Sequence, residues 1–488
     1  MTTDKASMQE GISVIIVNWL LIVLVLLYLA MVAAAVVMVV KDNRNPIRAL
    51  AWVIALIFLP GVGVIFYLFF GRSLKGMHMI SQHQKRRLLH DHKVVRVDLD
   101  TLHVSRDTRN LIKLAHNICR SPLTIDNRID IFTDGLSKFN ALKEDLRHAR
   151  KSIFLQYYIF LDDGIGQEIA DILIEKAGQG LEVKVIYDNV GSFKASNSFF
   201  RRLNAAGVDT HPFFRVTFPE LANRINWRNH RKIVVIDEAI AYVGGMNIAD
   251  RYVRPVDGKP EWRDTHFRLQ GNIVESCIYS FAVDWNFMKK APQLSPIECR
   301  PADFHNELGM QLITSGPVDT WDNIALCFLK CIAMAKRSIY IQTPYFLPTD
   351  ALLRALEAAA LSKIDVRIMI PEHSDSRMLQ YASFSYVTRC LNAGIKVYLY
   401  TRSMLHAKCM IIDDDVVTAG STNFDFRSFE NNFECNLLIY DRDFNARMRD
   451  IFFNDIKQSR KLTYAKWHAR PKLQRLTESV VRLFAPIL

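Results

Sequence analysis

Two histidine–lysine pairs stand out in this chain as candidates for catalysis. His230 and Lys232 open the segment HRKIVVID, and His406 and Lys408 open the segment HAKCMIID. An imidazole can act as a nucleophile or carry protons near neutral pH, and ammonium groups stabilise negative charge on oxygen. Two such pairs at one place could displace a group at a phosphodiester without a metal ion. One imidazole would attack phosphorus, the other would protonate the leaving oxygen, and the lysines would hold the non-bridging oxygens.

Each pair begins a longer repeated motif. In both copies an aspartate follows the histidine after seven positions (Asp237, Asp413) and an asparagine after 17 positions (Asn247, Asn423), so each of these positions recurs at an offset of 176. The asparagines are candidate neutral donors to phosphate oxygens. One histidine–lysine pair would arise by chance, but two copies in register indicate a duplicated catalytic half.

The repeat extends upstream and indicates which elements position the motifs. Residues 149–156 recur as 335–342 at an offset of 186, so the first copy contains ten more residues, most simply within 213–229. Each copy reads strand, helix, strand, helix, strand and motif hairpin, which is typical of an α/β unit with a buried sheet. Because one motif carries half of the chemical groups, we predict that the halves face each other across a pseudo-twofold axis. The predicted halves are 105–300, with its motif at 230–247, and 301–456, with its motif at 406–423.

The motifs resemble the HKD signature of the phospholipase D superfamily, and within it the chain is similar to the bacterial cardiolipin synthase family. The likeness includes the hydrophobic N-terminal segments, the segment NWRNH before the first motif, the segment SFENNFE that ends at Glu434, and the basic tail. The resemblance implies two α/β/α sandwich halves. It also implies transfer of a phosphatidyl group between two molecules of phosphatidylglycerol through a phosphohistidine, giving cardiolipin and glycerol.

The resemblance also assigns roles that the symmetric sequence leaves open. It implies that His230 is the nucleophile and that His406 is the general acid and base. Asp264 and Glu434, which follow their motifs by 34 and 28 residues, resemble carboxylates that fix the tautomer of these rings. An ordinary surface or salt-bridged acid remains the alternative for each. The tyrosines and phenylalanines near the strand ends, such as Tyr158, could line an acyl channel, although core packing is the alternative.

The motif aspartates have two possible roles. On a strand, residues two apart share a face, so the histidine and lysine of each motif are expected side by side. Asp237 and Asp413 lie at an odd step and precede acidic turns. That spacing favours support of the turn, whereas the superfamily signature counts both aspartates with the catalytic residues.

Two uncharged N-terminal segments predict membrane anchoring. Residues 11–40 and 49–71 each exceed the roughly 20 apolar residues that cross a bilayer. We predict two transmembrane helices, followed by a basic linker at 72–104. Because the second segment contains Pro-Gly-Val-Gly at 60–63, the alternative is that it is kinked or enters the membrane without crossing it. Two crossings would place the N-terminus and the catalytic region on the same side of the membrane. The basic residues that flank the two segments favour the cytoplasmic side of a bacterial inner membrane.

The charge and the missing motifs narrow the function. A net charge of +12 suits an anionic membrane surface. The basic tail 457–488 carries apolar residues at helical spacing, which predicts either an interfacial helix or one docked on the catalytic body. The chain contains neither a phosphate loop nor a dinucleotide-binding turn. We expect no cofactor, no metal and no nucleic acid partner; the alternatives are a hydrolytic phospholipase D, another phosphatidyltransferase, and a membrane-tethered nuclease.

Overall fold

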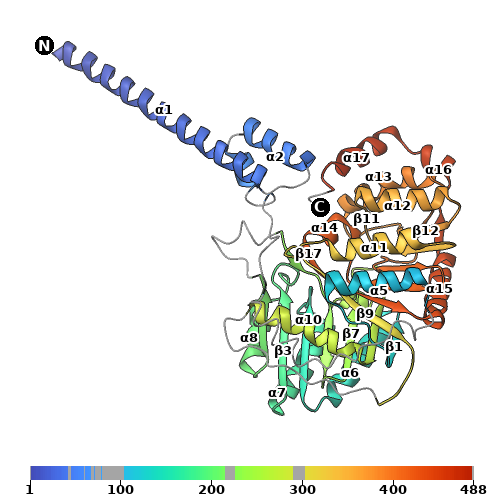
Figure 1. The fold of residues 1–488 in the computed structure, drawn as a ribbon. Helices are drawn as coiled ribbons and strands as arrows, with labels where there is room; N and C mark the ends of the chain where they lie inside the picture. Colours follow the sequence, from blue (N-terminus) through green and yellow to red (C-terminus); the bar gives the residue numbers. More distant parts are fainter. Residues whose placement is uncertain are drawn as a thin grey trace. The chain divides into compact units, whose positions relative to one another are not determined.

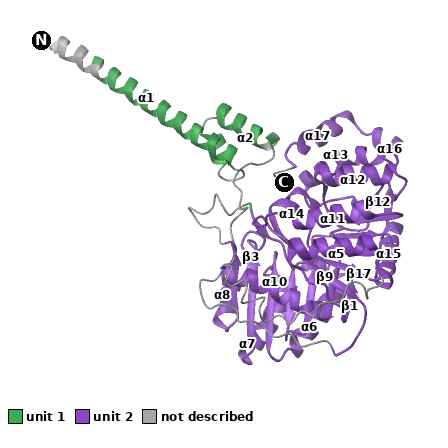
Figure 2. Cartoon of the chain, in the orientation of Figure 1, with its two compact units in different colours: residues 1–74, 217–226 green, residues 75–216, 227–488 purple. Residues whose placement is uncertain are grey.

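The chain divides into two compact units in the computed structural model. One consists of residues 1–74 and 217–226, and the other of 75–216 and 227–488 (Figure 2). The predicted linker at 72–104 lies outside the described residues except for positions 79 and 104, as does most of the stretch expected to hold the ten extra residues. The structure describes residues 2–41, 46–59, 61–67, 71, 79, 104–214, 226–288 and 303–485.

Among its described residues, the N-terminal unit contains one helix that is long and apolar enough to span a membrane. This span, Ser13–Lys41, belongs to α1 (Thr2–Lys41). The described residues of the second apolar segment contain two shorter helices, α2 (Pro46–Phe58) and α3 (Val62–Phe66), which are separated at Gly61, where φ is 71° and left-handed. The 13 residues of α2 reach about 20 Å, short of a bilayer core of about 30 Å. Of the two predicted transmembrane helices, one candidate is therefore present among the described residues.

The first half is built on a seven-stranded sheet of order β1-β8-β7-β6-β2-β3-β4 (Figure 1). β2, β3 and β4 run parallel, whereas the motif hairpin β6–β7 and the strands β8 and β1 are antiparallel. The strands are β1 (Asn127–Phe132), β2 (Ser152–Tyr157), β3 (Glu182–Asp188), β4 (Asp209–Phe213), β6 (Ile233–Ile236), β7 (Ile240–Gly244) and β8 (His266–Gly271). The helices are α6 (Gly135–His148), α7 (Gly164–Gly178), α8 (Asn197–Ala205) and α10 (Ile273–Met288), with a 3-10 turn at Asp250–Tyr252.

The second half repeats this strand order in the sequence β9-β17-β15-β14-β10-β12-β13, and β18 extends the sheet at its edge. The strands are β9 (Gly309–Ser315), β10 (Ser338–Gln342), β12 (Asp365–Pro371), β13 (Lys396–Tyr400), β14 (Cys409–Ile412), β15 (Val416–Gly420), β17 (Asn432–Tyr440) and β18 (Ser459–Lys461). A two-stranded sheet pairs β11 (Phe346–Leu347) with β16 (Phe424–Asp425). The helices are α11 (Asn323–Met334), α12 (Asp350–Leu361), α13 (Arg377–Asn392), α14 (Phe426–Glu430), α15 (Arg442–Lys457), α16 (Tyr464–His468) and α17 (Lys472–Arg482).

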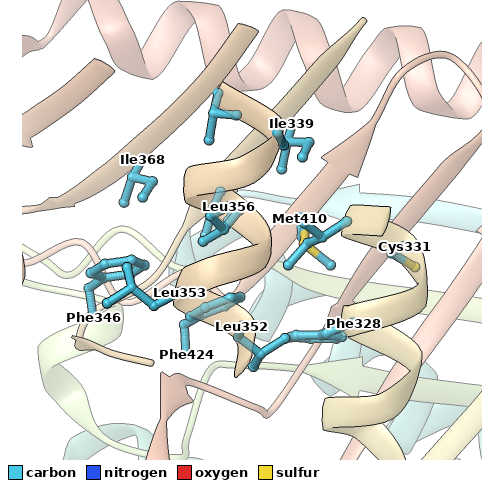
Figure 3. Close-up of a cluster of buried hydrophobic side chains, with 14 of the residues drawn as sticks. Phe328, Cys331, Ile339, Phe346, Leu352, Leu353, Leu356, Ile368, Met410 and Phe424 are labelled. Atoms are coloured by element: carbon cyan, nitrogen blue, oxygen red, sulfur yellow. The ribbon is translucent and has the colours of Figure 1, made fainter. Parts of the chain in front are cut away.

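Both sheets lie between layers of helices, because each central strand is apolar on both faces. In β2, Ile153 and Leu155 pack in a cluster with α6, α7 and α8, while Phe154 stacks on Phe281 of α10 at 5.2 Å. In β10, Ile339 joins the cluster of α11, α12 and α13 (Figure 3). Burying one such side chain contributes about 1.5–3 kcal/mol. The observed architecture is a mixed α/β fold with buried sheets.

Packing departs from sequence order at α5 (Arg106–Cys119). This helix begins at the Ser105 N-cap, and its buried residues Leu111, Ile112 and Ala115 belong to the core of the second half, against α11 and β9. The sequence range 105–300 therefore contains an element that packs with the other half. Its apolar stripe alone does not say which core it joins.

Candidate active site

The two motifs meet through exchanged backbone contacts. The sequence predicts the motif histidines and lysines on strands, but the structure places them just before β6 and β14. β5 (Arg228–Asn229) pairs with the start of β17, and His230 N donates to Phe433 O at 2.9 Å. In the equivalent contact of the other motif, His406 N donates to Arg263 O at 2.7 Å. Each histidine is thus fixed beside a segment of the opposite half.

Each histidine ring is held by a carboxylate of the opposite half. His230 Nδ1 lies 3.0 Å from Glu434 Oε2, and His406 Nδ1 lies 2.6 Å from Asp264 Oδ2. Both carboxylates are fully buried, and the histidines are only 7% and 6% exposed. When Nδ1 donates to the carboxylate, the Nε2 atom of the ring keeps its lone pair for chemistry. At His406 the Lys408 ammonium also lies 2.7 Å from Nδ1, and Asp264, the closer partner at 2.6 Å, assigns the proton to Nδ1. The sequence placed these residues near the motifs but did not show that the pairs cross between the halves.

The motif lysines supply buried positive charge beside the rings. Lys232 Nζ donates to His230 O at 2.6 Å and Lys408 Nζ donates to His406 O. Lys408 Nζ also lies 3.8 Å from Asp264 Oδ2. Lys232 is fully buried and Lys408 is 3% exposed, so their charges act in a medium that screens them weakly.

Burial sets the protonation states of the site. It lowers the pKa of His230 to about 4, against the opposing effect of Glu434, and lowers the pKa of His406 well below its usual value. Both rings are therefore neutral near pH 7 and can act as nucleophile or base. Burial also lowers the pKa of Lys232 to about 7 and raises that of Asp264 to about 6. Burial opposes ionisation of Glu434 too, but His230 and Lys232 hold its pKa below the usual value.

The motif asparagines have different surroundings. Asn247 accepts from Ile159 N at 3.2 Å and donates to Tyr252 Oη at 3.1 Å, and that hydroxyl lies 3.3 Å from His406 Nδ1. Asn247 therefore holds a tyrosine beside the second histidine. The buried Asn423 forms a side-chain hydrogen bond with Asp425. The Oδ1 atom of Asn423 has no hydrogen-bond partner among the described atoms.

The motif aspartates lie at the far end of the hairpins. Asp237 accepts from the backbone N–H groups of residues 150, 151 and 152 at 2.7–3.0 Å. Asp413 accepts from those of residues 336, 337 and 338 at 2.8 Å each. Both have a positive φ, 51° and 48°, which aspartate tolerates better than most residues. The structure does not bring them to the histidines; each ties its hairpin turn to the start of β2 or β10.

Replacing Asp413 with alanine is expected to lower the stability of the folded protein more than its catalytic turnover. Three backbone donors would lose their acceptor, which costs about 2–4 kcal/mol in the free energy of unfolding. Thermal unfolding of the purified protein, with turnover measured at a temperature where the variant is folded, checks this. Asp415→Ala, two residues along in the same turn, is the matched control and should leave both unchanged. An Asp413→Ala protein of normal stability without turnover would place the aspartate in the chemistry.

Comparison with known proteins decides the family. A family model described as the PLD-like domain of cardiolipin synthase matches residues 142–257 and 328–456, and a phospholipase D-nuclease N-terminal model matches 27–72. The chain is 38% identical to the major cardiolipin synthase of Bacillus subtilis over 478 residues, covering 96% of this chain and 99% of the relative. The chain belongs to the cardiolipin synthase family of phospholipase D-like enzymes. A cardiolipin synthase of Geobacillus is also 38% identical, over 92% of this chain and 90% of the relative.

A solved structure supports the fold of this cardiolipin synthase family member. A phosphatidylserine synthase of Haemophilus influenzae superposes with a TM-score of 0.59 over 78% of this chain and 98% of its own, at 15% identity. An identity this low shows the shared fold alone.

Sequence reasoning missed part of the aromatic wall around the histidines of this family member. The ring of Tyr158 meets the ring of His230 edge-on at 4.8 Å, and Trp262 lies 5.2 Å from His406, beside Tyr252. The sequence suggests a place for Tyr158 in an acyl channel or in the core, not beside His230. Trp262 could have been found from the sequence, because it lies two residues before Asp264, which is itself a predicted site residue. Each imidazole therefore has an aromatic ring packed beside it.

A buried ion pair beneath the first motif was also missed. Arg231 Nη1 lies 2.7 Å from Asp284 Oδ1, and both side chains are buried. Arg231 Nε also donates to Glu434 O at 3.1 Å. The middle residue of the first motif therefore fixes the backbone of the carboxylate that holds His230, whereas the second motif has Ala407 at the same place.

Proposed function

We propose that this enzyme moves the phosphatidyl group of one phosphatidylglycerol to the terminal hydroxyl of a second, giving cardiolipin and glycerol. The observation that carries the proposal is the crossed pairing of His230 with Glu434 and of His406 with Asp264. It leaves two neutral imidazoles, one from each half, with free Nε2 atoms and lysines alongside. The substrate class is supported by relatives named cardiolipin synthase that match nearly the whole chain.

In the first step His230 Nε2 forms a bond to phosphorus, and the bond from phosphorus to the glycerol oxygen breaks. His406 gives that oxygen a proton, so glycerol leaves as a neutral alcohol. His406 must therefore take up a proton from solvent when the substrate binds, and the negative charge of the arriving phosphodiester favours this uptake because it raises the pKa of the ring. Lys232 and Lys408 stabilise the charge that grows on the non-bridging oxygens.

In the second step His406 takes the proton of the incoming hydroxyl, and that oxygen displaces His230 from phosphorus. The products are cardiolipin and a neutral His230 ring. Replacing one phosphodiester by another needs no external energy source, but water must be kept from the intermediate. The low exposure of both histidines and the aromatic rings beside them suit that requirement.

His230 as the nucleophile is supported by the surroundings of Glu434. Phosphorylation leaves a positive charge on the ring, which an ionised partner stabilises. Asn432 Nδ2 donates to Glu434 Oε1 at 3.2 Å and Ser421 donates to Oε2, so this carboxylate is held in its charged form. Asp264, whose pKa is raised to about 6, accepts a proton more readily and suits the ring that exchanges protons.

The products from phosphatidylglycerol alone test the proposal. Full-length enzyme in detergent–lipid micelles should yield cardiolipin and glycerol in equal amounts. Phosphatidate with glycerol would identify a hydrolase, and products that appear only with another alcohol would identify a different transferase. Release of nucleotides from added DNA in place of lipid products would overturn the proposal altogether.

We also propose a multi-pass place in a bacterial inner membrane, with the catalytic halves in the cytoplasm facing an anionic lipid surface. One spanning candidate, a second apolar segment and the net charge of +12 support this. A green fluorescent protein fused after residue 488 should fluoresce, whereas a periplasmic alkaline phosphatase fused there should be inactive. The opposite pattern would reverse the orientation.

The pH dependence of kcat/KM is expected to form a narrow bell. Lys232 acts as a cation, and its pKa of about 7 means that activity falls as pH rises above that value. Asp264 acts as an anion, and its pKa of about 6 means that activity falls as pH drops below that value. Lys232→Arg should remove the alkaline limb, since guanidinium stays charged, even if the rate is lower.

The matched control for this profile is Lys143→Arg, whose side chain lies on α6 in an ion pair with Glu168. It should leave both limbs in place. An alkaline limb that persists in Lys232→Arg would show that another group causes it.

A further inference from the structure

The helix α17 near the end of the described chain packs with its apolar side exposed and a glutamate buried. α17 and its C-cap residue Leu483 expose large apolar side chains: Leu473 is 75% exposed, Leu476 60% and Leu483 74%. The buried residue of the same helix is a glutamate, Glu478, at 2%. A helix that simply docks on a protein core does the reverse and buries its apolar stripe.

The polar side of α17 is tied to the catalytic body. Glu478 Oε2 accepts from Arg470 Nη2 at 3.1 Å, and the Arg470 guanidinium lies 3.3 Å from the centroid of the Trp467 ring. That tryptophan is buried against Phe384 of α13. α17 itself runs along α13 (Figure 1). These contacts hold the helix in place with its polar side against the catalytic body and its apolar side facing outward.

The exposed residues form one continuous face. Leu473, Leu476, Val480, Leu483 and Phe484 recur at three, four, three and one positions, which places them within about 100° around a helix of 3.6 residues per turn. All five are at least 47% exposed. A face of this kind on a folded protein marks a contact with another apolar phase or partner.

Charge selects the partner. α17 carries Lys472, Arg475 and Arg482, against the single acid Glu478, which is already paired with Arg470. A second copy of this basic chain would bring like charges together, whereas an anionic lipid surface complements them. A bilayer is also within reach, because the same chain contains the apolar span Ser13–Lys41.

We propose that α17 is an interfacial helix that lies in the surface of a bilayer containing anionic lipid. Its leucines and Phe484 enter the boundary between headgroups and acyl chains, and its basic residues meet the phosphates. The helix gives the second half a contact with the membrane that is separate from α1. This inference concerns a surface outside the proposed catalytic residues and does not depend on which lipid the enzyme makes.

Photocrosslinking in a membrane tests it. Full-length protein with Leu476→p-benzoylphenylalanine is placed in vesicles of equal amounts of phosphatidylethanolamine and phosphatidylglycerol, irradiated, and digested for mass spectrometry. The matched control is Leu136→p-benzoylphenylalanine on α6, a leucine that is 55% exposed where Leu476 is 60% exposed. We expect lipid acyl-chain adducts at position 476 at least fivefold above those at 136.

Three results would overturn the inference. Adducts between two chains would assign the face to a second copy, and adducts to another peptide of the same chain would assign it to an internal contact. Equal lipid labelling at positions 476 and 136 would mean that the helix has no special contact with the bilayer. Because the readout is a covalent adduct, it stays informative even if the enzyme makes no cardiolipin.

Discussion

Replacing either His230 or His406 with alanine is expected to lower cardiolipin formation at least ~10⁴-fold while leaving the protein folded and in the membrane. The size follows from the effect of removing a nucleophile or its proton carrier from a catalytic set that acts as a unit. His148→Ala, at an exposed histidine on α6, is the matched control and should retain full activity. Product analysis from phosphatidylglycerol measures the loss.

The two histidine variants should fail at different steps. A phosphatidyl ester of p-nitrophenol has a leaving group that needs no proton, so His406→Ala should still release one equivalent of nitrophenol and retain a phosphatidyl adduct on His230. His230→Ala should show neither the burst nor the adduct. The reverse pattern would exchange the roles of the two rings, and turnover by either variant near the wild-type rate would refute the mechanism.

Neutralising the two crossed carboxylates should have the next largest effect. Glu434→Gln and Asp264→Asn keep the shape of each side chain but remove the charge that stabilises a positive imidazole, and they permit the wrong tautomer. A loss of about 10²–10⁴-fold in kcat is expected for each. Glu372→Gln, at an exposed ion pair with Arg460, is the matched control and should have no effect on kcat.

The roles of the two carboxylates can also be distinguished by which step of the reaction each variant slows. Glu434→Gln should slow the nitrophenol burst, because Glu434 holds the attacking ring. Asp264→Asn should leave the burst intact and slow the transfer to the second phosphatidylglycerol, because Asp264 holds the ring that activates the alcohol. Both variants slowing the same step would contradict the crossed assignment of His230 to Glu434 and of His406 to Asp264.

Much of this arrangement follows from spacing alone. The offsets of 176 and 186 predicted a duplicated α/β unit, and both sheets have the same strand order. The odd step from His230 to Asp237 favoured a turn support, and the structure places that carboxylate on three backbone amides. Such features are local, because a strand or a hairpin turn fixes them over a few residues.

The features that escaped prediction are long-range. Glu434 and Asp264 each follow one motif in sequence yet hold the histidine of the other, which depends on how the two halves meet in space. The apolar stripe of α5 does not say which core it joins. Residues 49–71 are apolar enough for a span, but hydropathy does not report that Gly61 takes a left-handed conformation between two short helices.

The crossed carboxylates make each half incomplete by itself. A single-repeat ancestor with this geometry would have had one imidazole without its acid partner, and only a pair of molecules could have assembled a working centre. Joining the two repeats in one polypeptide removes the dependence on how often two molecules meet in the membrane. Within one polypeptide the two copies can differ without either losing its counterpart, as they do at Arg231 and Ala407.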